Sequence, residues 1–289
     1  MRILLLFCLA VCAAAQPVPD LQGHRGARGL MPENTVPSFL EALRYGMTTM
    51  ELDLAVSADS QLVVSHEPWF SDVICRRPDG QDVAAADTSS IFQLPYAEVR
   101  RYDCGSRPNP RFPEQRLMPA PKPTLAEVVE AVDGAAMVRG VPLPWYNIET
   151  KSRPSWEPTH QPDPVTFAQL VYDELRRLNL LDRATVQSFD VRTLQAMRAI
   201  DPEVILVLLD GTSGDVQAII DTLGFVPAIY SPYFLFVNPD MIQTARDLGM
   251  RVVPWTVNDE SAMRTLLDAG VDGIITDYPD RLRRVAGGR

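Results

Sequence analysis

Three carboxylates occur on two short apolar stretches of the kind that forms buried β-strands. Glu51 and Asp53 stand two residues apart, and Glu149 and Lys151 repeat that spacing further along the chain. Because side chains alternate along a strand, each pair lies on one side of its strand. Adjacent carboxylates repel unless a proton or a cation lies between them, and carboxylate oxygens are ligands that Ca²⁺ and Mg²⁺ prefer. The spacing is equally compatible with a divalent-cation site, for Ca²⁺ or Mg²⁺, and with acids that pair with Lys or Arg inside the barrel.

Two of the three histidines, His24 and His66, fall at the ends of predicted strands. Imidazole titrates near neutral pH, so it can give or take a proton during a reaction. A lone histidine is more often structural, but two beside a carboxylate cluster indicate an acid–base pair. The third, His160, lies in a loop between two prolines, and we assign it no role.

Two further residues could contact a substrate or shape its pocket. The glycine-containing segment 23–29 matches neither GxGxxG nor the P-loop pattern, so it does not indicate nucleotide binding. Within it, Arg25 could hold a phosphate through two parallel hydrogen bonds. Trp255, near the end of a predicted strand, either walls a pocket or packs in the core.

These residues need a scaffold, and apolar runs alternate with helical patterns along most of the chain, as in parallel α/β folds. The predicted strands are residues 21–26, 49–55, 145–151, 184–189, 204–209, 228–231, 251–257 and 273–276. The predicted helices include residues 38–45, 125–132, 164–178, 191–199, 241–248 and 262–269. Thr35 is the expected N-cap of the first helix, and Gly249 and Gly270 stand where helix C-caps belong. Eight strands with regular spacing predict a (β/α)8 barrel.

One interval interrupts this rhythm. Residues 61–66 form an additional predicted strand, paired as a hairpin with the second barrel strand. Residues 67–123 are loop-rich, with many Pro, Arg and Asp residues. Since inserted segments lie on loops, and βα loops face the active site of a barrel, we expect this insertion to roof the site. Residues 16–289 are thus predicted to form one domain.

The N-terminus has the pattern of a secretory signal peptide, residues 1–15. Arg2 precedes an apolar run that ends at Cys12, followed by small residues typical of a cleavage site. A lipid anchor at Cys12 is the weaker alternative, because Val11 fits a lipobox poorly. We therefore expect an exported protein, periplasmic or secreted. In that oxidising setting Cys75 and Cys104 are expected to form a disulfide, the alternative being two buried thiols.

The composition excludes several kinds of partner. The 289 residues are 46% hydrophobic and 22% charged, and 27 basic against 37 acidic residues give a net charge of −10. An acidic chain without a Lys/Arg cluster carries no electrostatic footprint for nucleic acid or for an anionic membrane. No later stretch offers about 18 apolar residues, so no stable membrane insertion is expected. A small-molecule substrate remains; the oligomeric state is not predicted.

Eight short motifs then occur in order: His24-Arg25-Gly26, Pro32-Glu33-Asn34-Thr35, Glu51-Leu52-Asp53, Val64-Ser65-His66, Ile148-Glu149-Thr150-Lys151, Gln187-Ser188-Phe189-Asp190, Pro254-Trp255-Thr256-Val257-Asn258 and Asp272-Gly273-Ile274-Ile275-Thr276-Asp277. Over residues 20–285 the chain resembles the glycerophosphodiester phosphodiesterase family. The resemblance implies a (β/α)8 barrel with an insertion after the second strand. It implies these roles: cation ligands Glu51, Asp53 and Glu149; acid–base residues His24 and His66; phosphate contacts Arg25 and Lys151; and supporting residues Glu33 and Gln187. The family often has His-Asp where this chain has His66-Glu67, which leaves the orientation of that imidazole open.

The reaction implied is metal-dependent hydrolysis of glycerophosphodiesters to an alcohol and glycerol 3-phosphate. One histidine would take a proton from the nucleophile, and the other would give one to the leaving alcohol. An alternative is phospholipase D-like action on lysophospholipids or sphingolipids, in an apolar channel built from Trp69, Phe70 and Phe92 of the insertion. A second alternative is a binding protein without catalysis, against which the two histidines argue.

Overall fold

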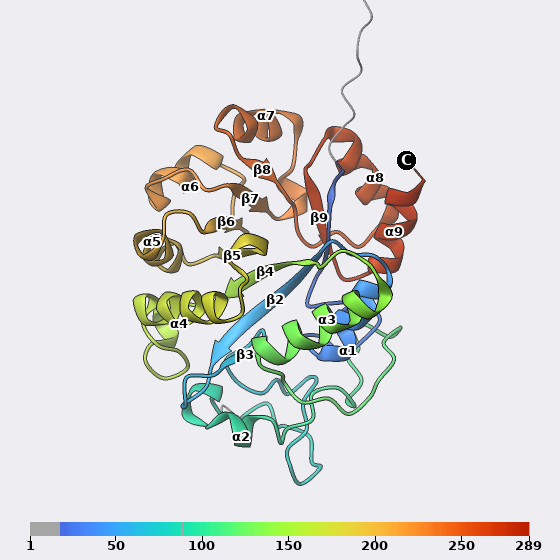
Figure 1. The fold of residues 1–289 in the computed structure, drawn as a ribbon, viewed down its shortest axis with the longest axis vertical. Helices are drawn as coiled ribbons and strands as arrows, with labels where there is room; N and C mark the ends of the chain where they lie inside the picture. Colours follow the sequence, from blue (N-terminus) through green and yellow to red (C-terminus); the bar gives the residue numbers. More distant parts are fainter. Residues whose placement is uncertain (1–17, 88, 289) are drawn as a thin grey trace, which may run out of the picture.

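The computed structural model describes residues 18–87 and 89–288, which form a barrel of parallel strands surrounded by helices (Figure 1). The predicted signal peptide, residues 1–15, lies outside the described residues. In the described chain the barrel strands are β1 (Asp20–Gly23), β2 (Thr49–Val56), β4 (Trp145–Thr150), β5 (Ala184–Ser188), β6 (Ile205–Asp210), β7 (Ile229–Pro232), β8 (Arg251–Val252) and β9 (Gly273–Thr276). They pair in parallel in the order β8-β7-β6-β5-β4-β2-β1-β9.

The strands at the two ends of this order, β8 and β9, meet and close the barrel. Asp272 donates its N–H to the carbonyl of Val252 at 2.8 Å, and Ile275 donates to Pro254 at 3.0 Å. The regular part of β8 is shorter than the predicted strand 251–257, because Pro254 has no N–H for the ladder. The predicted (β/α)8 barrel is confirmed.

Helices cover the outside of the barrel: α1 (Val36–Arg44), α3 (Leu125–Arg139), α4 (Pro164–Arg177), α5 (Val191–Ile200), α6 (Val216–Leu223), α7 (Pro239–Asp247), α8 (Glu260–Ala269) and α9 (Pro279–Gly287). All of these except α9 begin at a Thr, Asp or Asn whose side chain accepts an N–H of the first turn. Thr35 caps α1 as predicted, and Gly270 ends α8 at φ 93°. The predicted helices are all present; α6 and α9 were not among them.

Successive side chains of each strand alternate between the side that faces the helices and the side that faces the barrel interior. Leu52 and Ile148 are fully buried in the same hydrophobic core as the helices. The intervening residues point the other way, and in the β2–β4 register Asp53 lies opposite Glu149. The pleat therefore turns the acidic side chains into the barrel.

Residues 67–123 lie along one side of the barrel, beside β2 and β3 (Leu62–Val64), which pair in antiparallel fashion as predicted (Figure 1). This insertion contains α2 (Tyr96–Val99), and it packs on Ala55 of β2 and Val63 of β3 in a small second hydrophobic core that includes Phe70 and Val83. Among its described residues, only Arg111 and Phe112 line the large cavity treated below. The insertion thus contributes an edge of the cavity and not a complete roof. Short 3₁₀ helices complete the described chain: η1 (Ile91–Gln93), η2 (Pro154–Trp156), η3 (Leu181–Arg183) and η4 (Phe234–Phe236).

A disulfide joins Cys75 and Cys104 inside the core of the insertion. We expect the double variant Cys75→Ser, Cys104→Ser to loosen residues 67–123 while the barrel stays folded, because the bond closes a loop only within that segment. Its loss costs about 3–4 kcal/mol in the loop-entropy description. Limited proteolysis with mass mapping checks this: cleavage should concentrate in the insertion. Equal protease resistance of the variant and the parent, or two alkylated thiols in the unreduced parent, would contradict the expectation.

Candidate active site

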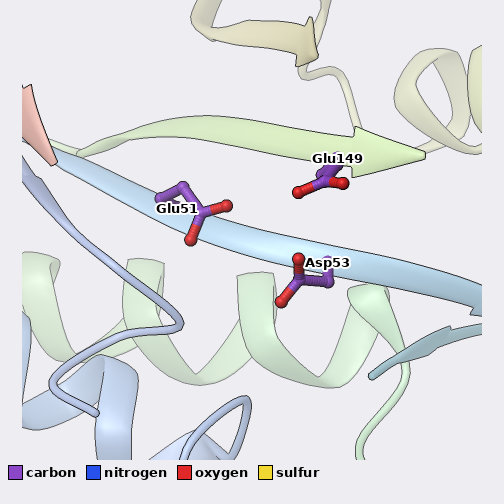
Figure 2. A group of neighbouring side chains, drawn as sticks. All are labelled: Glu51, Asp53 and Glu149. Atoms are coloured by element: carbon purple, nitrogen blue, oxygen red, sulfur yellow. The ribbon is translucent and has the colours of Figure 1, made fainter. Parts of the chain in front are cut away.

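Three buried carboxylates meet where β2 and β4 lie side by side. Glu51 and Asp53 project from β2 and Glu149 from β4, and their carboxylate groups point toward one another (Figure 2). One oxygen from each lies within 4.8 Å of the others. The fold thus brings together the three carboxylates that the sequence indicated as candidate cation ligands.

The hydrogen bonds around two of these carboxylates hold their oxygens in place. The side-chain amide of Gln187 donates to Glu51 Oε1 at 2.7 Å, and the Arg25 N–H donates to Glu51 Oε2 at 2.9 Å. Asn34 Nδ2 donates to Asp53 Oδ2 at 2.8 Å. The other oxygen of Asp53, Oδ1, is buried and has no hydrogen-bond partner. An orphaned carboxylate oxygen inside an acidic cluster is a feature that a bound cation would satisfy.

The electrostatics of the cluster also indicate a site for a cation. Burial raises the pKa of Glu51 well above its ordinary value, and the charges of Asp53 and Glu149 raise that pKa further. Burial also acts to raise the pKa of Asp53, but the positive charges of Arg25, His66 and Lys151 outweigh it and hold that pKa well below the usual range. Protein cations therefore compensate the cluster only in part, and its all-oxygen donor set fits Ca²⁺ or Mg²⁺.

A tight turn after β1 presents the first motif to the site. Arg25 has φ 50° and Gly26 φ 82°, and a side chain on Gly26 would meet Ser38 at 2.6 Å. Ser38 Oγ accepts the N–H of Ala27 and donates to the carbonyl of Arg25, which locks the turn against α1. The left-handed conformation of Arg25 is uncommon for a non-glycine residue and occurs at functional sites. It directs the backbone N–H of Arg25 at Glu51.

His24 is oriented by a carboxylate from the far end of the sequence. Its Nδ1 lies 2.7 Å from Asp277 Oδ1, and its Nε2 lies 3.9 Å from Glu51 Oε2. Arg28 donates to both oxygens of Asp277. Burial acts to raise the pKa of Asp277, but His24 and Arg28 hold it far below its ordinary value, so the carboxylate is ionised and Nδ1 carries the hydrogen. Burial and the charge of Arg28 lower the pKa of His24 to about 4, against the opposing effect of Asp277.

His66 is oriented in the same way by its neighbour. Nδ1 of its ring lies 2.7 Å from Glu67 Oε1, and this contact determines the orientation of the imidazole that the sequence left open. Burial acts to raise the pKa of Glu67, but His66 and Arg25 lower it to about 2. Beneath this loop, the buried Lys122 donates to Ser65 Oγ at 2.8 Å, and Ser65 Oγ donates to the carbonyl of Glu67. In both histidines Nε2 is the atom left for chemistry.

The two predicted phosphate-binding cations are anchored by the acidic cluster itself. Lys151 Nζ donates to Glu149 Oε1 at 2.7 Å and lies 3.7 Å from Asp53 Oδ1. Arg25 donates through its terminal nitrogen to Glu33 at 2.7 Å, while its Nε lies 3.2 Å from Asp53. Glu33 is thus a support for Arg25 and has no oxygen in the carboxylate cluster, as predicted for a residue behind the ligands.

One cavity of about 1070 Å³ connects the main groups of the site: its lining includes His24, His66, Arg25, Lys151, Glu51 and Glu149. Trp255 lines it too: its ring makes edge contacts with Phe189 and lies 5.6 Å from Tyr233, and its indole N–H donates to Ser231. Of the two predictions for Trp255, the pocket wall is the one that the structure supports.

Other sequence candidates lie away from this cavity. His160 contacts Trp69 edge to face, and neither residue lines the cavity. Phe70 stacks on Tyr102 within the core of the insertion, and Phe92 packs against the main core. Trp69, Phe70 and Phe92 therefore do not form the apolar channel that the phospholipase D-like alternative would need, because these side chains pack against other described residues.

Four site residues had no predicted role: Arg28, Asn34, Lys122 and Asp277. Arg28, Asn34 and Asp277 lie inside or beside the quoted motifs, so their sequence signal was visible. Their partners could be assigned only with the fold, since His24 and Asp277 are 253 positions apart and meet because β1 pairs with β9. Lys122 stands in a Pro-rich segment where a buried ammonium gives no sequence signal.

Asp277 yields a test of how His24 is held. We expect Asp277→Asn to lower kcat by about 10–100-fold, because an amide can present its NH₂ to Nδ1 and favour the wrong tautomer of His24. Steady-state kinetics with cation affinity measured in parallel checks this. Asp247→Asn, at an exposed carboxylate at the end of α7 and outside the cavity, is the matched control and should behave as the parent does. Unchanged kcat for Asp277→Asn would refute the orienting role.

Barrel enzymes carry their reacting groups at the carboxyl ends of the strands, and this chain does the same. Fold and site together define a (β/α)8-barrel enzyme with two carboxylate-bound histidines next to an acidic cluster. Its sequence matches the profile of the glycerophosphoryl diester phosphodiesterase family over residues 24–281. The chain belongs to this family, and the prediction of an enzyme of the phosphoric diester hydrolase class is confirmed.

Individual relatives agree over nearly the whole chain. A glycerophosphodiester phosphodiesterase of Caldanaerobacter subterraneus subsp. tengcongensis is 26% identical over 259 residues, covering 90% of this chain and 94% of the relative. The crystal structure of a Silicibacter pomeroyi protein assigned as a glycerophosphoryl diester phosphodiesterase superposes with a TM-score of 0.83 at 30% identity, covering 94% of both chains. An Oleispira antarctica phosphodiesterase, solved in complex with the product sn-glycerol-3-phosphate, shares the fold with a TM-score of 0.72 at 23% identity, covering 93% of this chain and 97% of that one.

None of the helices in the described part of the chain combines the length and the apolar character needed to cross a bilayer.

Proposed function

We propose that this protein hydrolyses glycerophosphodiesters to an alcohol and glycerol 3-phosphate, with Ca²⁺ or Mg²⁺ held by Glu51, Asp53 and Glu149. The observation that carries the proposal is the pair His24 and His66. Each has Nδ1 bound by a carboxylate and Nε2 left over, and both line the cavity that contains the acidic cluster. A binding protein would need no such pair. The product named in the Oleispira antarctica complex is consistent with this reaction.

The role of each residue in this reaction follows from its position in the site. Arg25 and Lys151 lie against the carboxylates and line the cavity, so they can contact the non-bridging oxygens of a phosphodiester. A bound divalent cation supplies further positive charge to the phosphate oxygens. One imidazole Nε2 accepts the proton of the attacking hydroxyl as the new P–O bond forms. The other protonates the alcohol oxygen as its bond to phosphorus breaks.

The attacking hydroxyl belongs either to water or to the glycerol of the substrate, in the second case through a cyclic phosphate. The same two imidazoles serve both routes, since each route needs one proton removed and one delivered. Phosphorus NMR during turnover separates them, because only the second route produces a cyclic glycerol phosphate signal.

An assay of glycerophosphocholine, glycerophosphoethanolamine and a lysophospholipid, each with and without added Ca²⁺ or Mg²⁺, tests the proposal. We expect release of glycerol 3-phosphate from the first two only when a cation is present. Turnover of the lysophospholipid alone would replace this proposal with lysophospholipase D activity. Binding of glycerophosphocholine without turnover under all conditions would leave a binding protein.

We further propose that the protein acts outside the cytoplasm. The support is the apolar run of residues 3–12 with its small-residue cleavage pattern, together with the disulfide between Cys75 and Cys104, which is stable in oxidising compartments. Fractionation of the native host with antibodies against the protein, and N-terminal sequencing of the mature form, test this proposal. An intact N-terminus in a cytoplasmic fraction would refute it.

A further inference from the structure

Three arginines line the cavity without a role in the proposed catalysis: Arg111 in the insertion, Arg153 after β4, and Arg281 in α9, which pairs with Glu114 at 2.9 Å. Arginines nearer the reacting groups are neutralised, Arg25 by Glu33 and Arg28 by Asp277. Among the ion pairs of the described residues, none includes Arg111 or Arg153, and both side chains are exposed. Their charges are therefore available to a bound molecule.

Both guanidinium groups are held by aromatic rings of the cavity wall. The Cζ atom of Arg153 lies 4.8 Å from the centroid of the Trp156 ring, and that of Arg111 lies 5.7 Å from the centroid of Phe112. Contact with a ring face restrains a guanidinium but leaves its N–H edge free to donate two parallel hydrogen bonds. That edge matches a phosphate or carboxylate.

The two arginines adjoin residues of the site. The Phe112 ring beside Arg111 also contacts Arg28 at 4.6 Å, and Arg28 binds Asp277, the partner of His24. Arg153 follows Lys151 by two residues as the chain leaves β4. The cavity of about 1070 Å³ is at the upper end for pockets that bind drug-sized ligands, so it can hold a phosphodiester with a substantial alcohol.

We propose that Arg111 and Arg153 bind a second anionic group carried by the leaving alcohol, and that the preferred substrates are glycerophosphodiesters with an additional phosphate. This inference rests on the proposed hydrolysis. The protein has a net charge of −10 and as a whole repels polyanions. The unpaired Arg111 and Arg153 provide local positive charge at the cavity, where a second anionic group could bind. A neutral or cationic alcohol, such as choline, would gain nothing from them.

Two substrates that differ by one glycerophosphate group test the effect of the second charge. The first is glycerophosphoglycerol, and the second is bis(glycerophospho)glycerol, in which the terminal hydroxyl carries another glycerophosphate. Both present the same scissile bond. After division by two for its two equivalent bonds, we expect kcat/KM of the second substrate to exceed that of the first by about tenfold at low salt. Added salt should reduce the ratio, because exposed charges are screened.

Arg111→Gln and Arg153→Gln should each lower this ratio about threefold, with the loss falling mainly on the doubly charged substrate. Arg139→Gln, at an exposed arginine in the last turn of α3 and outside the cavity, is the control and should leave the ratio unchanged. A parent ratio near one, or a ratio that neither cavity variant lowers, overturns the inference while the proposed hydrolysis stands. Turnover of neither substrate overturns the inference alone if the same preparation hydrolyses glycerophosphocholine, and it overturns the proposed function as well if glycerophosphocholine is not hydrolysed either.

Discussion

Glu51→Gln and Glu149→Gln are each expected to weaken Ca²⁺ or Mg²⁺ binding at least about 100-fold and to abolish turnover at limiting cation. Each substitution removes one of three carboxylates whose oxygens lie within 4.8 Å of one another and replaces it with a neutral group of similar shape. Chelation of the parent protein should have the same effect, and added Ca²⁺ or Mg²⁺ should restore activity. Titration calorimetry gives the affinity without reference to catalysis.

Glu67→Gln is the matched control, since Glu67 contacts His66 and contributes no oxygen to the cluster. Its cation affinity should equal that of the parent even if its activity falls. Thermal unfolding adds a second readout, because a ligand at 100 times its dissociation constant stabilises the folded state by about 2.7 kcal/mol. Full turnover of a metal-stripped sample would end the metal-dependent mechanism.

With a cation bound, the parent protein should be more stable than Glu51→Gln, because the parent keeps all three carboxylates. Without a cation, the parent should lose this advantage. Burial and two like charges raise the pKa of Glu51, so the folded state binds a proton at Glu51 more tightly than the unfolded chain does. The contribution of this group to stability therefore falls as pH rises above the unfolded pKa of about 4.3. Glu51→Gln removes that penalty, so without cation the variant should be at least as stable as the parent at neutral pH. A purely structural glutamate would give the reverse.

Most of the scaffold followed from the periodicity of the sequence. Strand residues such as Met50, Leu52 and Leu54 are apolar and alternate with Glu51 and Asp53, which predicted both the strand and the side that carries the carboxylates. Strand ends were less predictable, because backbone features that interrupt a ladder are set by tertiary contacts. The first strand ends at Gly23 since the chain turns there onto α1, and β8 ends before Pro254.

Within the site, the sequence could predict the relative positions of residues that are only a few positions apart in the chain. Glu51 and Asp53 share a strand, and Glu149 lies on the next one in the barrel, with Lys151 directly after that strand. The partners of His24 and Asp53 come from other elements, so they depend on which strands become neighbours. The positions of Arg111 and Phe112 depend on how the insertion packs, and no periodicity in a loop-rich segment determines that.

His24→Ala and His66→Ala are each expected to lower kcat by about 10²–10⁴-fold with cation binding intact. Both rings are oriented through Nδ1, by Asp277 and Glu67 respectively, and neither nitrogen is needed to complete the carboxylate cluster. The double variant should lose much less than the product of the two single losses, because an acid and a base that act in one reaction are not independent. His160→Ala is the control, since that ring packs against Trp69 outside the cavity, and it should behave as the parent does.

The two variants should separate on a substrate with a better leaving group. A p-nitrophenyl phosphodiester releases a phenolate that needs little protonation, so loss of the histidine that protonates the leaving alcohol should cost far less there than on glycerophosphocholine. Loss of the histidine that deprotonates the nucleophile should cost the same on both substrates. The variant that recovers therefore identifies the acid, and the other identifies the base. If His24→Ala and His66→Ala both retain near-normal kcat on glycerophosphocholine, the acid–base assignment is wrong, and Arg25, Lys151 and the bound cation must account for catalysis without it.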